Sequence, residues 1–215
     1  MKHIVWDWNG TLLDDLGLVV DATNASLALF GAGPVTADEH RRDFIRPITA
    51  YYEGVIGRPI SAAEFENLDR EFHAAYNAGA PHLGLTFGVP DLLAGYGPHQ
   101  SLLSMWFHKD LVPAVSRHGL TDYFRRVDGL RATVGGGHKA PLLKEHLAEM
   151  GLDPADVVLI GDSVDDADAA AAVGAGAVLY SGGFTHVDKL RAVGVPVVDT
   201  LEDAVKLVRS GLTTA

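Results

Sequence analysis

The chain has 215 residues, of which 47% are hydrophobic and 21% are charged, with a formal net charge of -11. This composition is that of a globular protein and excludes an intrinsically disordered chain. The acidic balance argues against a nucleic-acid-binding protein, because such proteins need a basic face. The absence of cysteine excludes disulfides, thiolate catalysis and cysteine-ligated metal sites. No apolar run is long enough to cross a membrane, so we expect a soluble, cytoplasmic protein without a membrane partner.

The N-terminal segment predicts a short buried strand at residues 3–6, which runs into a turn at residues 7–11. The stretch that follows, to about residue 85, has only helical signals, and Ser61 with Glu64 fits a capping box. We therefore expect a helical bundle inserted directly after the first strand. The expected helices cover residues 16–27, 36–44, 48–56 and 61–76.

After Gly88 the pattern changes to strands that alternate with helices. Such alternation implies right-handed crossovers and a parallel sheet that is covered by helices on both faces. The predicted fold is α/β, with a Rossmann-like parallel-sheet core at residues 1–14 and 86–215 and an inserted helical cap at residues 15–85. The expected strands are 101–105, 157–160, 177–180 and 195–198, and the expected helices are 89–96, 111–118, 140–150, 167–173 and 201–209.

Polar side chains follow several of these strands, at the edge of the sheet where open α/β folds bind their ligands. Aspartates at two separate strand ends suit Mg²⁺, a hard cation that prefers oxygen ligands. A lysine and hydroxyl groups beside the metal could hold phosphate oxygens. Together these groups supply a nucleophile, a metal and charge stabilisation, which is what phosphoryl transfer needs. The candidates are Asp7, Asn9, Thr11, Ser104, Lys139, Asp162, Asp165 and Asp166.

Four short motifs carry these residues, and through them the chain resembles the haloacid dehalogenase-like (HAD) hydrolases, with a helical cap as in phosphoglycolate phosphatase-like members. One motif alone would be a weak signal, but four in the family's order are specific. The resemblance spans residues 4 to about 185. The motifs are Asp7-Trp8-Asn9-Gly10-Thr11-Leu12, Ser104 after the apolar run Ser101-Leu102-Leu103, Lys139 followed by Pro141, and Gly161-Asp162-Ser163-Val164-Asp165-Asp166.

The resemblance implies a role for each matching residue. Asp7 would attack the phosphorus atom of a small phosphorylated substrate and bind Mg²⁺. The backbone carbonyl of Asn9 and the carboxylates of Asp162 and Asp166 would complete the metal site. The helical cap would exclude water and select the substrate. Thr11 and Ser104 would hydrogen-bond the phosphoryl group, and Lys139 would offset negative charge on the nucleophile and the phosphate.

Asn9 departs from the family pattern, because most phosphatases of the family have an aspartate there that protonates the leaving group. An amide cannot exchange a proton in this way near neutral pH, and such a loss typically costs about 10²–10⁴ in rate. Three interpretations stay open: a phosphatase for acyl or aryl phosphates or with another acid, a metal-independent 2-haloacid dehalogenase, and a weak or inactive relative that binds a phosphate ligand or a partner. Deamidation of Asn9 before Gly10 is a further hypothesis, which peptide mapping would test.

Other residues have a functional and a structural interpretation. Arg46, before Pro47, is the substrate-binding candidate in the cap, because an arginine can bind a carboxylate or phosphate with two parallel bonds. Ser101 competes with Ser104 if the strand register differs. For the remaining candidates we expect structural roles, which are solvation or helix capping for Asp165 and Asp168, loop exposure for His108 and His138, and packing for Trp8, Tyr51 and Tyr52.

Overall fold

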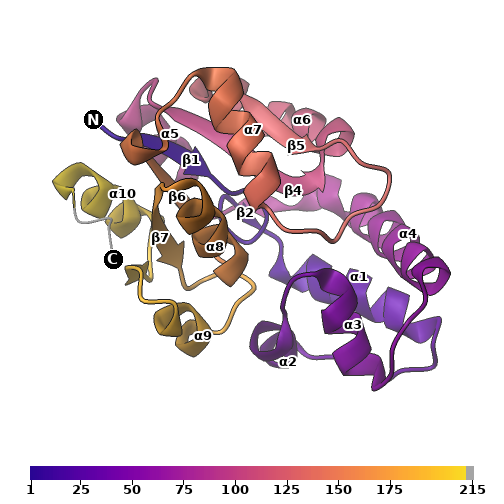
Figure 1. Cartoon of the computed structure of the whole chain (residues 1–215). Helices are drawn as coiled ribbons and strands as arrows, with labels where there is room; N and C mark the ends of the chain where they lie inside the picture. Colours follow the sequence, from indigo (N-terminus) through magenta and orange to yellow (C-terminus); the bar gives the residue numbers. More distant parts are fainter. Residues whose placement is uncertain (212–215) are drawn as a thin grey trace.

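The computed structural model describes residues 1–211, and in it six parallel strands form one sheet in the order β5-β4-β1-β6-β7-β8 (Figure 1). The predicted α/β class with a Rossmann-like parallel sheet is confirmed. Strand β1 is buried at each of its four residues and lies in the middle of the sheet, between β4 and β6. The strands are β1 His3–Trp6, β4 Gln100–Phe107, β5 Val127–Leu130, β6 Val157–Gly161, β7 Gly176–Tyr180 and β8 Val197–Val198.

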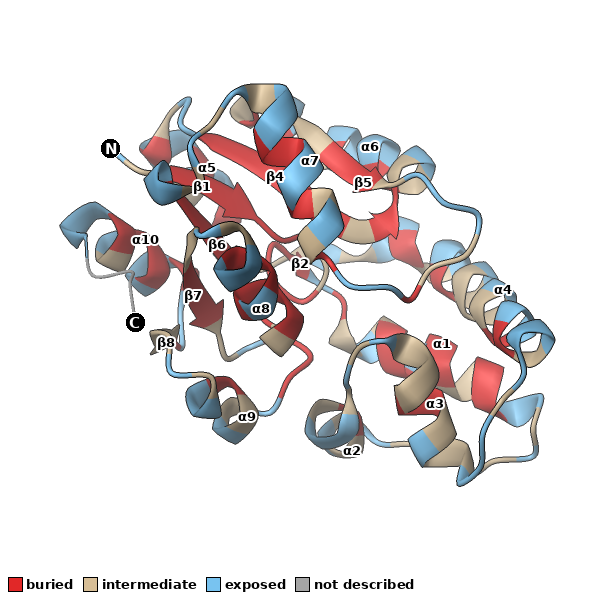
Figure 2. Cartoon of the chain, in the orientation of Figure 1, coloured by how far each residue is buried: buried red, intermediate tan, exposed pale blue. Residues whose placement is uncertain are grey.

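Helices cover both faces of this sheet, as the alternating pattern predicts. On one face α5 (Val89–Tyr96), α6 (His108–Arg117) and α10 (Leu201–Ser210) pack on side chains such as Trp6 and Ile160. On the other face α7 (Ala140–Met150), α8 (Val164–Val173) and α9 (Val187–Ala192) pack on the neighbouring residues of the same strands. Because successive strand residues point to opposite faces, the apolar runs feed two separate cores. Figure 2 shows the strands as the most buried part of the molecule.

Of the α-helices between β1 and β4 in the chain, all except α5 form a body beside the sheet, which we call the helical insert (Figure 1). They are α1 (Leu16–Ala28), α2 (Ala37–Asp43), α3 (Ile48–Ile56) and α4 (Ala62–Gly79), and a small antiparallel pair, β2 (Leu13–Asp14) with β3 (Gly84–Leu85), closes its two chain connections. The insert has its own small core around Leu27, Tyr52, Phe65 and Leu68. The expected capping box of Ser61 and Glu64 is present.

Two elements of the sheet layer were not expected from the sequence, strand β5 and helix α9. Strand β5 reads Val-Asp-Gly-Leu, which has neither an apolar run nor clear alternation. It pairs with β4 at the sheet edge, so tertiary pairing rather than local preference makes it a strand.

Within residues 1–211 no helix combines the length and the apolar character that crossing a membrane requires.

Candidate active site

The candidate residues meet at the carboxyl end of β1, where the order of strands in the sheet changes direction. Asp7 directly follows β1, Asp162 directly follows β6, and Ser104 lies within β4. Lys139 stands at the N-terminus of α7 and Asp166 in the first turn of α8. Because β4 and β6 both flank β1, residues more than 90 positions apart in the sequence face one another at this edge.

Lys139 forms the ionic link between the predicted nucleophile and the acidic motif. Its Nζ lies 2.8 Å from Asp7 Oδ1, and it also pairs with Asp166. Burial by itself would lower the pKa of Lys139, but the carboxylates of Asp166 and Asp7 outweigh burial and raise it. The lysine therefore stays charged. Burial raises the pKa of Asp7 to about 6, an effect that the ammonium of Lys139 opposes.

Three buried carboxylates converge beside this lysine, which suits a divalent cation. One oxygen from each of Asp7, Asp162 and Asp166 lies within 4.8 Å of the others. Burial, followed by repulsion from Asp7 and Asp166, raises the pKa of Asp162 well above its usual range. One lysine cannot neutralise three carboxylates, and a hard cation with oxygen ligands would supply the missing positive charge. The donor set thus fits Mg²⁺.

Asp162 is held in place by its neighbours, and Thr11 is one of them. The Thr11 hydroxyl donates to Asp162 Oδ1 at 3.0 Å, and the backbone N–H of Phe184 donates to Asp162 Oδ2 at 2.6 Å. Thr11 is fully buried and does not line the cavity, so its observed partner is Asp162, and its contact with a phosphoryl group stays a prediction. At Gly10, which has φ of 71°, a Cβ atom would lie 2.5 Å from Asp162 Oδ2, so only glycine allows the nucleophile loop to approach so closely.

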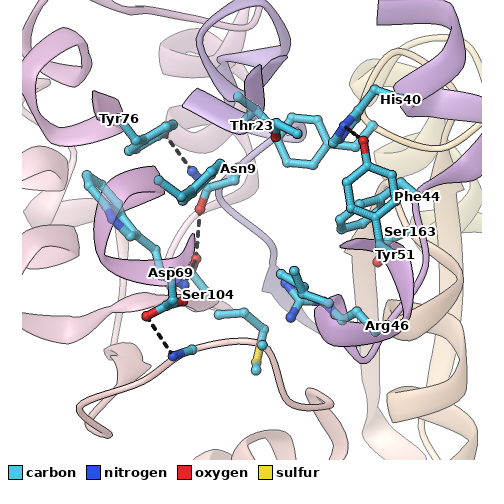
Figure 3. A pocket seen from close by; sticks show the side chains of 18 of the residues that line it. Asn9, Thr23, His40, Phe44, Arg46, Tyr51, Asp69, Tyr76, Ser104 and Ser163 are labelled. Carbon is cyan, nitrogen blue, oxygen red and sulfur yellow. Dashed lines mark hydrogen bonds between the residues drawn. The ribbon is translucent and has the colours of Figure 1, made fainter. Parts of the chain in front are cut away.

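Asn9 is bound on both sides of its amide, and two of its partners were missed in the sequence (Figure 3). Its Nδ2 donates to Asp15 Oδ2 at 2.7 Å and to the Tyr76 hydroxyl at 2.8 Å, and its Oδ1 accepts from Ser104 Oγ at 3.1 Å. Tyr76 in turn donates to Asp15 Oδ2 at 2.6 Å, and the N–H of Gly10 donates to Asp15 Oδ1. The carboxylate of Asp15 therefore lies beside Asn9, the position at which most phosphatases of the resembled family have an aspartate.

Asp15 is the centre of this network and is 1% exposed. Burial raises its pKa to about 6, although the hydrogen bonds from Asn9 and Tyr76 oppose this effect. In the sequence, Asp15 can be recognised only as a polar residue that follows the nucleophile loop, next to Asp14. Tyr76 gave no signal, because it comes from α4 in the insert and reaches Asn9 only in the folded chain.

The two competing serines of β4 are separated by the structure. Ser104 lines the cavity above the site and binds Asn9, while the N–H of Trp106 donates to its Oγ at 3.0 Å. Ser101 is fully buried elsewhere, with its Oγ 2.9 Å from His3 Nε2 and 2.8 Å from His146 Nε2. The register of β4 thus brings Ser104, and not Ser101, to the candidate site.

Asp165 requires a correction, because solvation or simple helix capping was expected for it. It is 8% exposed and accepts a hydrogen bond from the N–H of Lys139 at 2.9 Å. Asp165 Oδ1 lies 2.9 Å from His138 Nδ1, and Asp165 Oδ2 lies 3.6 Å from Arg46 Nε. Asp165 therefore fixes the loop that carries the lysine. Asp168 is exposed as expected.

The other residues with two interpretations are placed as follows. Arg46 lines the cavity but is engaged by Asp165 and by the carbonyl of Gly137, to which Nη1 donates at 3.0 Å. The exposed His138 fits its expectation, whereas His108 is half-buried and accepts from the N–H of Gly129. Trp8 is fully buried in the core, and Tyr51 and Tyr52 are buried in the insert, where they also border the cavity.

A cavity lies directly over the candidate residues, between the sheet edge and the insert (Figure 3). Asp7, Asn9, Ser104, Lys139 and Asp162 line it on the side of the sheet. Helices α1 to α4 line it from the insert, with residues such as Thr23, Phe44 and Tyr76. The arrangement places the candidate nucleophile Asp7, a charged lysine and clustered carboxylates on the sheet side of the cavity.

Comparison with known proteins agrees with this geometry. The sequence model of a family described as HAD-hydrolase-like matches residues 134–204. The chain is 30% identical over 196 residues to phosphoglycolate phosphatase of Synechococcus elongatus, with 89% of both chains covered. It is 28% identical over 193 residues to N-acetylmuramic acid 6-phosphate phosphatase of Pseudomonas aeruginosa, covering 86% of this chain and 84% of that one.

A solved structure shows the same fold at low sequence identity. A predicted phosphatase from Clostridium acetobutylicum superposes with a TM-score of 0.84 at 15% identity, and the match covers 97% of this chain and 98% of that one. The fold, the order of the motifs and the 30% identity over most of both chains lead to one conclusion. The chain belongs to the haloacid dehalogenase-like (HAD) hydrolases, in the phosphoglycolate phosphatase-like branch.

Proposed function

We propose that this phosphatase-type hydrolase cleaves small phosphate monoesters or acyl phosphates through a covalent aspartyl-phosphate on Asp7, with Mg²⁺ at the adjacent carboxylates. Phosphatase activity is the function that its family relatives share. One observation supports the mechanism most strongly: Asp7 lies 2.8 Å from a buried, charged lysine and within 4.8 Å of two more buried carboxylates. A carboxylate placed only for structure does not need both a lysine and a cation site.

In the proposed first step Asp7 Oδ attacks phosphorus, and the bond from phosphorus to the leaving oxygen breaks with its electron pair on that oxygen. Lys139 keeps Asp7 ionised at neutral pH despite burial, and it offsets the charge that gathers on the phosphoryl oxygens. In the second step water attacks the phosphorus, the Asp7 carboxylate leaves, and inorganic phosphate forms. The water proton passes to the solvent, because Asn9 cannot accept it.

The proposed metal ligands are Asp7, Asp162, Asp166 and the backbone carbonyl of Asn9. When bound, Mg²⁺ would neutralise the clustered carboxylates and polarise a phosphoryl oxygen. Thr11 and the N–H of Phe184 orient Asp162, and Ser163 orients Asp166 through a capping box. Ser104, which faces the cavity, is the proposed hydroxyl donor to the phosphoryl group.

The insert is the proposed cap that covers the substrate, since α1 to α4 form the far side of the cavity. The relatives named above act on phosphoglycolate and on a sugar 6-phosphate, both small phosphate monoesters. Of the alternatives, a metal-independent dehalogenase has no use for three buried carboxylates around one point. A pure binding module has no need of a lysine paired with the nucleophile.

The test is phosphate release from acetyl phosphate and p-nitrophenyl phosphate with Mg²⁺. We expect Asp7→Asn to lower kcat by about 10³-fold or more, as removal of a nucleophile does in other hydrolases. Acid quenching of the wild type during turnover should trap a phosphoryl group on the peptide that contains Asp7. Asp168→Asn makes the same change at an exposed aspartate of α8, so it is the control and should keep full activity. Full turnover by Asp7→Asn would exclude the mechanism, and halide release from 2-haloacids without metal would favour the dehalogenase.

A further inference from the structure

The cavity above Asp7 is unusually rich in aromatic side chains. Seven of the 23 residues that line it are Phe, Tyr or Trp, although these types make up only 8% of the chain. Most of them come from the insert, which is the part of the molecule that faces the leaving group of a substrate held at Asp7. The lining therefore favours a leaving group with a flat, apolar face.

Figure 3 shows Tyr76 on one side of the cavity and Phe44 and Tyr51 on the other. Six of the seven aromatic side chains form two groups around these residues, which we call the α4 wall and the α2–α3 wall. In the α4 wall, defined as Phe72, Tyr76 and Trp106, the Tyr76 ring stacks on Phe72 at 5.8 Å and meets Trp106 edge-on at 5.2 Å. The α2–α3 wall is defined by Phe44, Tyr51 and Phe184, with Phe44 5.8 Å from Tyr51 and 6.3 Å from Phe184.

Three buried polar atoms of residues that line the cavity have no hydrogen-bond partner among the described residues. They are Nε1 of Trp106, which is 7% exposed, Nε2 of His40, which is 1% exposed, and Nδ1 of His73. A buried polar atom without a hydrogen bond is costly, and a polar substituent on a bound ligand would lower that cost by supplying a partner. Burial lowers the pKa of His40 to about 4, so its ring is neutral and suits a neutral polar substituent.

The cavity offers no free positive charge to a carboxylate on the substrate. Within residues 1–211, the cations that line it are Lys139 and Arg46. Lys139 is engaged by Asp7 and Asp166, and Arg46 is engaged by Asp165 and the carbonyl of Gly137. Asp69 adds a negative charge to the lining. A small anionic acid such as phosphoglycolate would therefore lack an ion-pair partner for its carboxylate.

We propose that the preferred substrate is an aryl phosphate, the phosphate monoester of a phenol, whose ring lies between the α4 wall and the α2–α3 wall. This inference rests on the proposed Asp7 mechanism and narrows its substrate class. Asn9 supports it independently, because it leaves the site without the usual acid for the leaving group. A phenol has a pKa of about 10, as in tyrosine, whereas an alcohol resembles water, with a pKa near 16. A phenolate can leave without being protonated, and an alkoxide cannot leave readily.

The chemical step balances without a general acid. The bond from Asp7 Oδ to phosphorus forms, the bond from phosphorus to the phenolic oxygen breaks, and the phenolate departs with the electron pair. It takes a proton from the solvent after release. Water then cleaves the aspartyl-phosphate, and the Asp7 carboxylate is a good leaving group that also needs no acid. The water protons are shared between inorganic phosphate and the solvent.

The experiment separates ring binding from leaving-group chemistry by using four esters with Mg²⁺. Phenyl phosphate has a ring and a phenolate leaving group, and benzyl phosphate has a ring and an alkoxide. Phosphoglycolate and a hexose 6-phosphate have alkoxides without a ring. We expect kcat for phenyl phosphate to exceed that for benzyl phosphate by about 10²-fold or more, the size of a missing general acid. We expect both ring esters to have a KM at least tenfold lower than that of phosphoglycolate.

Variants of the walls test where the ring lies. Phe44→Leu and Phe72→Leu, one in each wall, keep an apolar side chain but remove a ring. Each should raise KM for phenyl and benzyl phosphate by a clearly larger factor than KM for acetyl phosphate, which has no ring. Retained acetyl phosphate turnover shows that the variants fold. Phe87→Ala, which removes a fully exposed ring outside the cavity, is the matched control.

The outcomes distinguish this inference from the proposed function. If phosphoglycolate or the hexose phosphate has a higher kcat/KM than phenyl phosphate, the aryl assignment is wrong while the Asp7 mechanism stands. Equal KM values for ring and non-ring esters would likewise exclude ring binding between the walls. If neither acetyl phosphate nor any ester is hydrolysed, or if hydrolysis survives Asp7→Asn, the proposed function fails as well.

Discussion

At the scale of single residues, the main feature of the site is the position of the amide of Asn9 and the carboxylate of Asp15 beside the nucleophile. Asn9 stands where an acid is expected, and Asp15, six residues later, supplies a buried carboxylate 2.7 Å from its amide. Burial raises the pKa of Asp15, yet the Asp15 oxygens face Asn9, Tyr76 and Gly10, and Asp15 does not line the cavity. The carboxylate is present, but it does not reach the leaving group.

The first prediction concerns this pair. Asn9→Asp alone would put two carboxyl groups in hydrogen-bond contact, so they would share a proton and the new group would titrate abnormally. We expect it to raise kcat for benzyl phosphate less than about tenfold. The exchange Asn9→Asp with Asp15→Asn keeps one acid and one amide, and it should raise kcat by about 10²-fold. Asp15→Asn alone is the control and should give no gain. Equal rates for the single and double variants would contradict the role assigned to Asp15.

The second prediction concerns the buried imidazole of His40, whose Nδ1 lies 2.9 Å from the Tyr51 hydroxyl. Burial lowers its pKa from 6.5 to about 4, so the unfolded chain binds a proton there that the folded chain does not. Its contribution to stability is therefore intact above pH 6.5 and is lost as the pH falls toward 4. The size of the loss is about 3 kcal/mol.

The measurement is the free energy of unfolding at pH 7.5 and at pH 4.5, for wild type and for His40→Gln, which does not titrate. Other buried groups also contribute between these pH values, with His3 acting in the same direction and Asp7 and Asp15 in the opposite one. They cancel in the comparison of the two proteins. We expect the wild type to lose stability relative to the variant on acidification, and a difference independent of pH would contradict the prediction.

At the scale of elements, helix α4 connects the insert to the nucleophile loop. Its residue Tyr76 is 1% exposed and binds both Asp15 and Asn9 through one hydroxyl group. The same ring belongs to the α4 wall of the cavity. Helix α4 also packs along α1, the first helix after the loop. Tyr76 is therefore a direct hydrogen-bonded contact between the insert and Asn9.

The third prediction follows from this connection. Tyr76→Phe keeps the ring but removes the hydroxyl, leaving a buried carboxylate without one of its donors, which typically costs about 1–3 kcal/mol. We also expect kcat to fall, because the amide of Asn9 loses one of its anchors. Tyr96→Phe is the matched control, since it removes one hydroxyl that donates to Lys2 O far from the site. Unfolding and steady-state kinetics should show a stability loss in both variants but a lower kcat only in Tyr76→Phe.

At the scale of the whole molecule, the sheet and the helices around it hold three like charges together in the interior. Asp7 follows β1, whereas Asp162 and Asp166 lie between the end of β6 and the first turn of α8, and folding brings one oxygen of each within 4.8 Å of the others. Their repulsion is a cost that the packed core sustains and that a bound cation would relieve. If the proposed site binds a metal ion, we therefore expect metal binding to increase the global stability of the protein.

The fourth prediction is that Mg²⁺ stabilises the fold. At a concentration about 100 times its Kd, a ligand that binds only the folded state adds about 2.7 kcal/mol. For a chain of this size that corresponds to a rise in Tm of roughly 5–10 °C. Thermal unfolding with Mg²⁺ or with a chelator measures the effect. Asp162→Asn should show no rise, whereas Asp168→Asn should match the wild type. A Mg²⁺-dependent rise of equal size in Asp162→Asn would place the ion elsewhere.

The amino-acid sequence by itself determined the sheet, the helical insert and most of the candidate residues. Strand β6, Val157–Gly161, is a continuous buried run that ends at Asp162 and Ser163, and β1 likewise runs directly into Asp7. Those patterns are local, so they can be recognised without the fold. Strand β5 could not be recognised in this way, because its residues become a strand only by pairing with β4 at the edge.

Only the tertiary structure decided how the candidate residues act together. The register of β4 brings Ser104 rather than Ser101 to the cavity, and the packing of α4 brings Tyr76 to Asn9. Thr11 lies behind Asp162, and Arg46 is already engaged by Asp165. Each of these facts depends on side chains that are distant in the sequence. The sequence specifies which chemical groups a strand end presents, whereas their partners, burial and pKa follow from long-range packing.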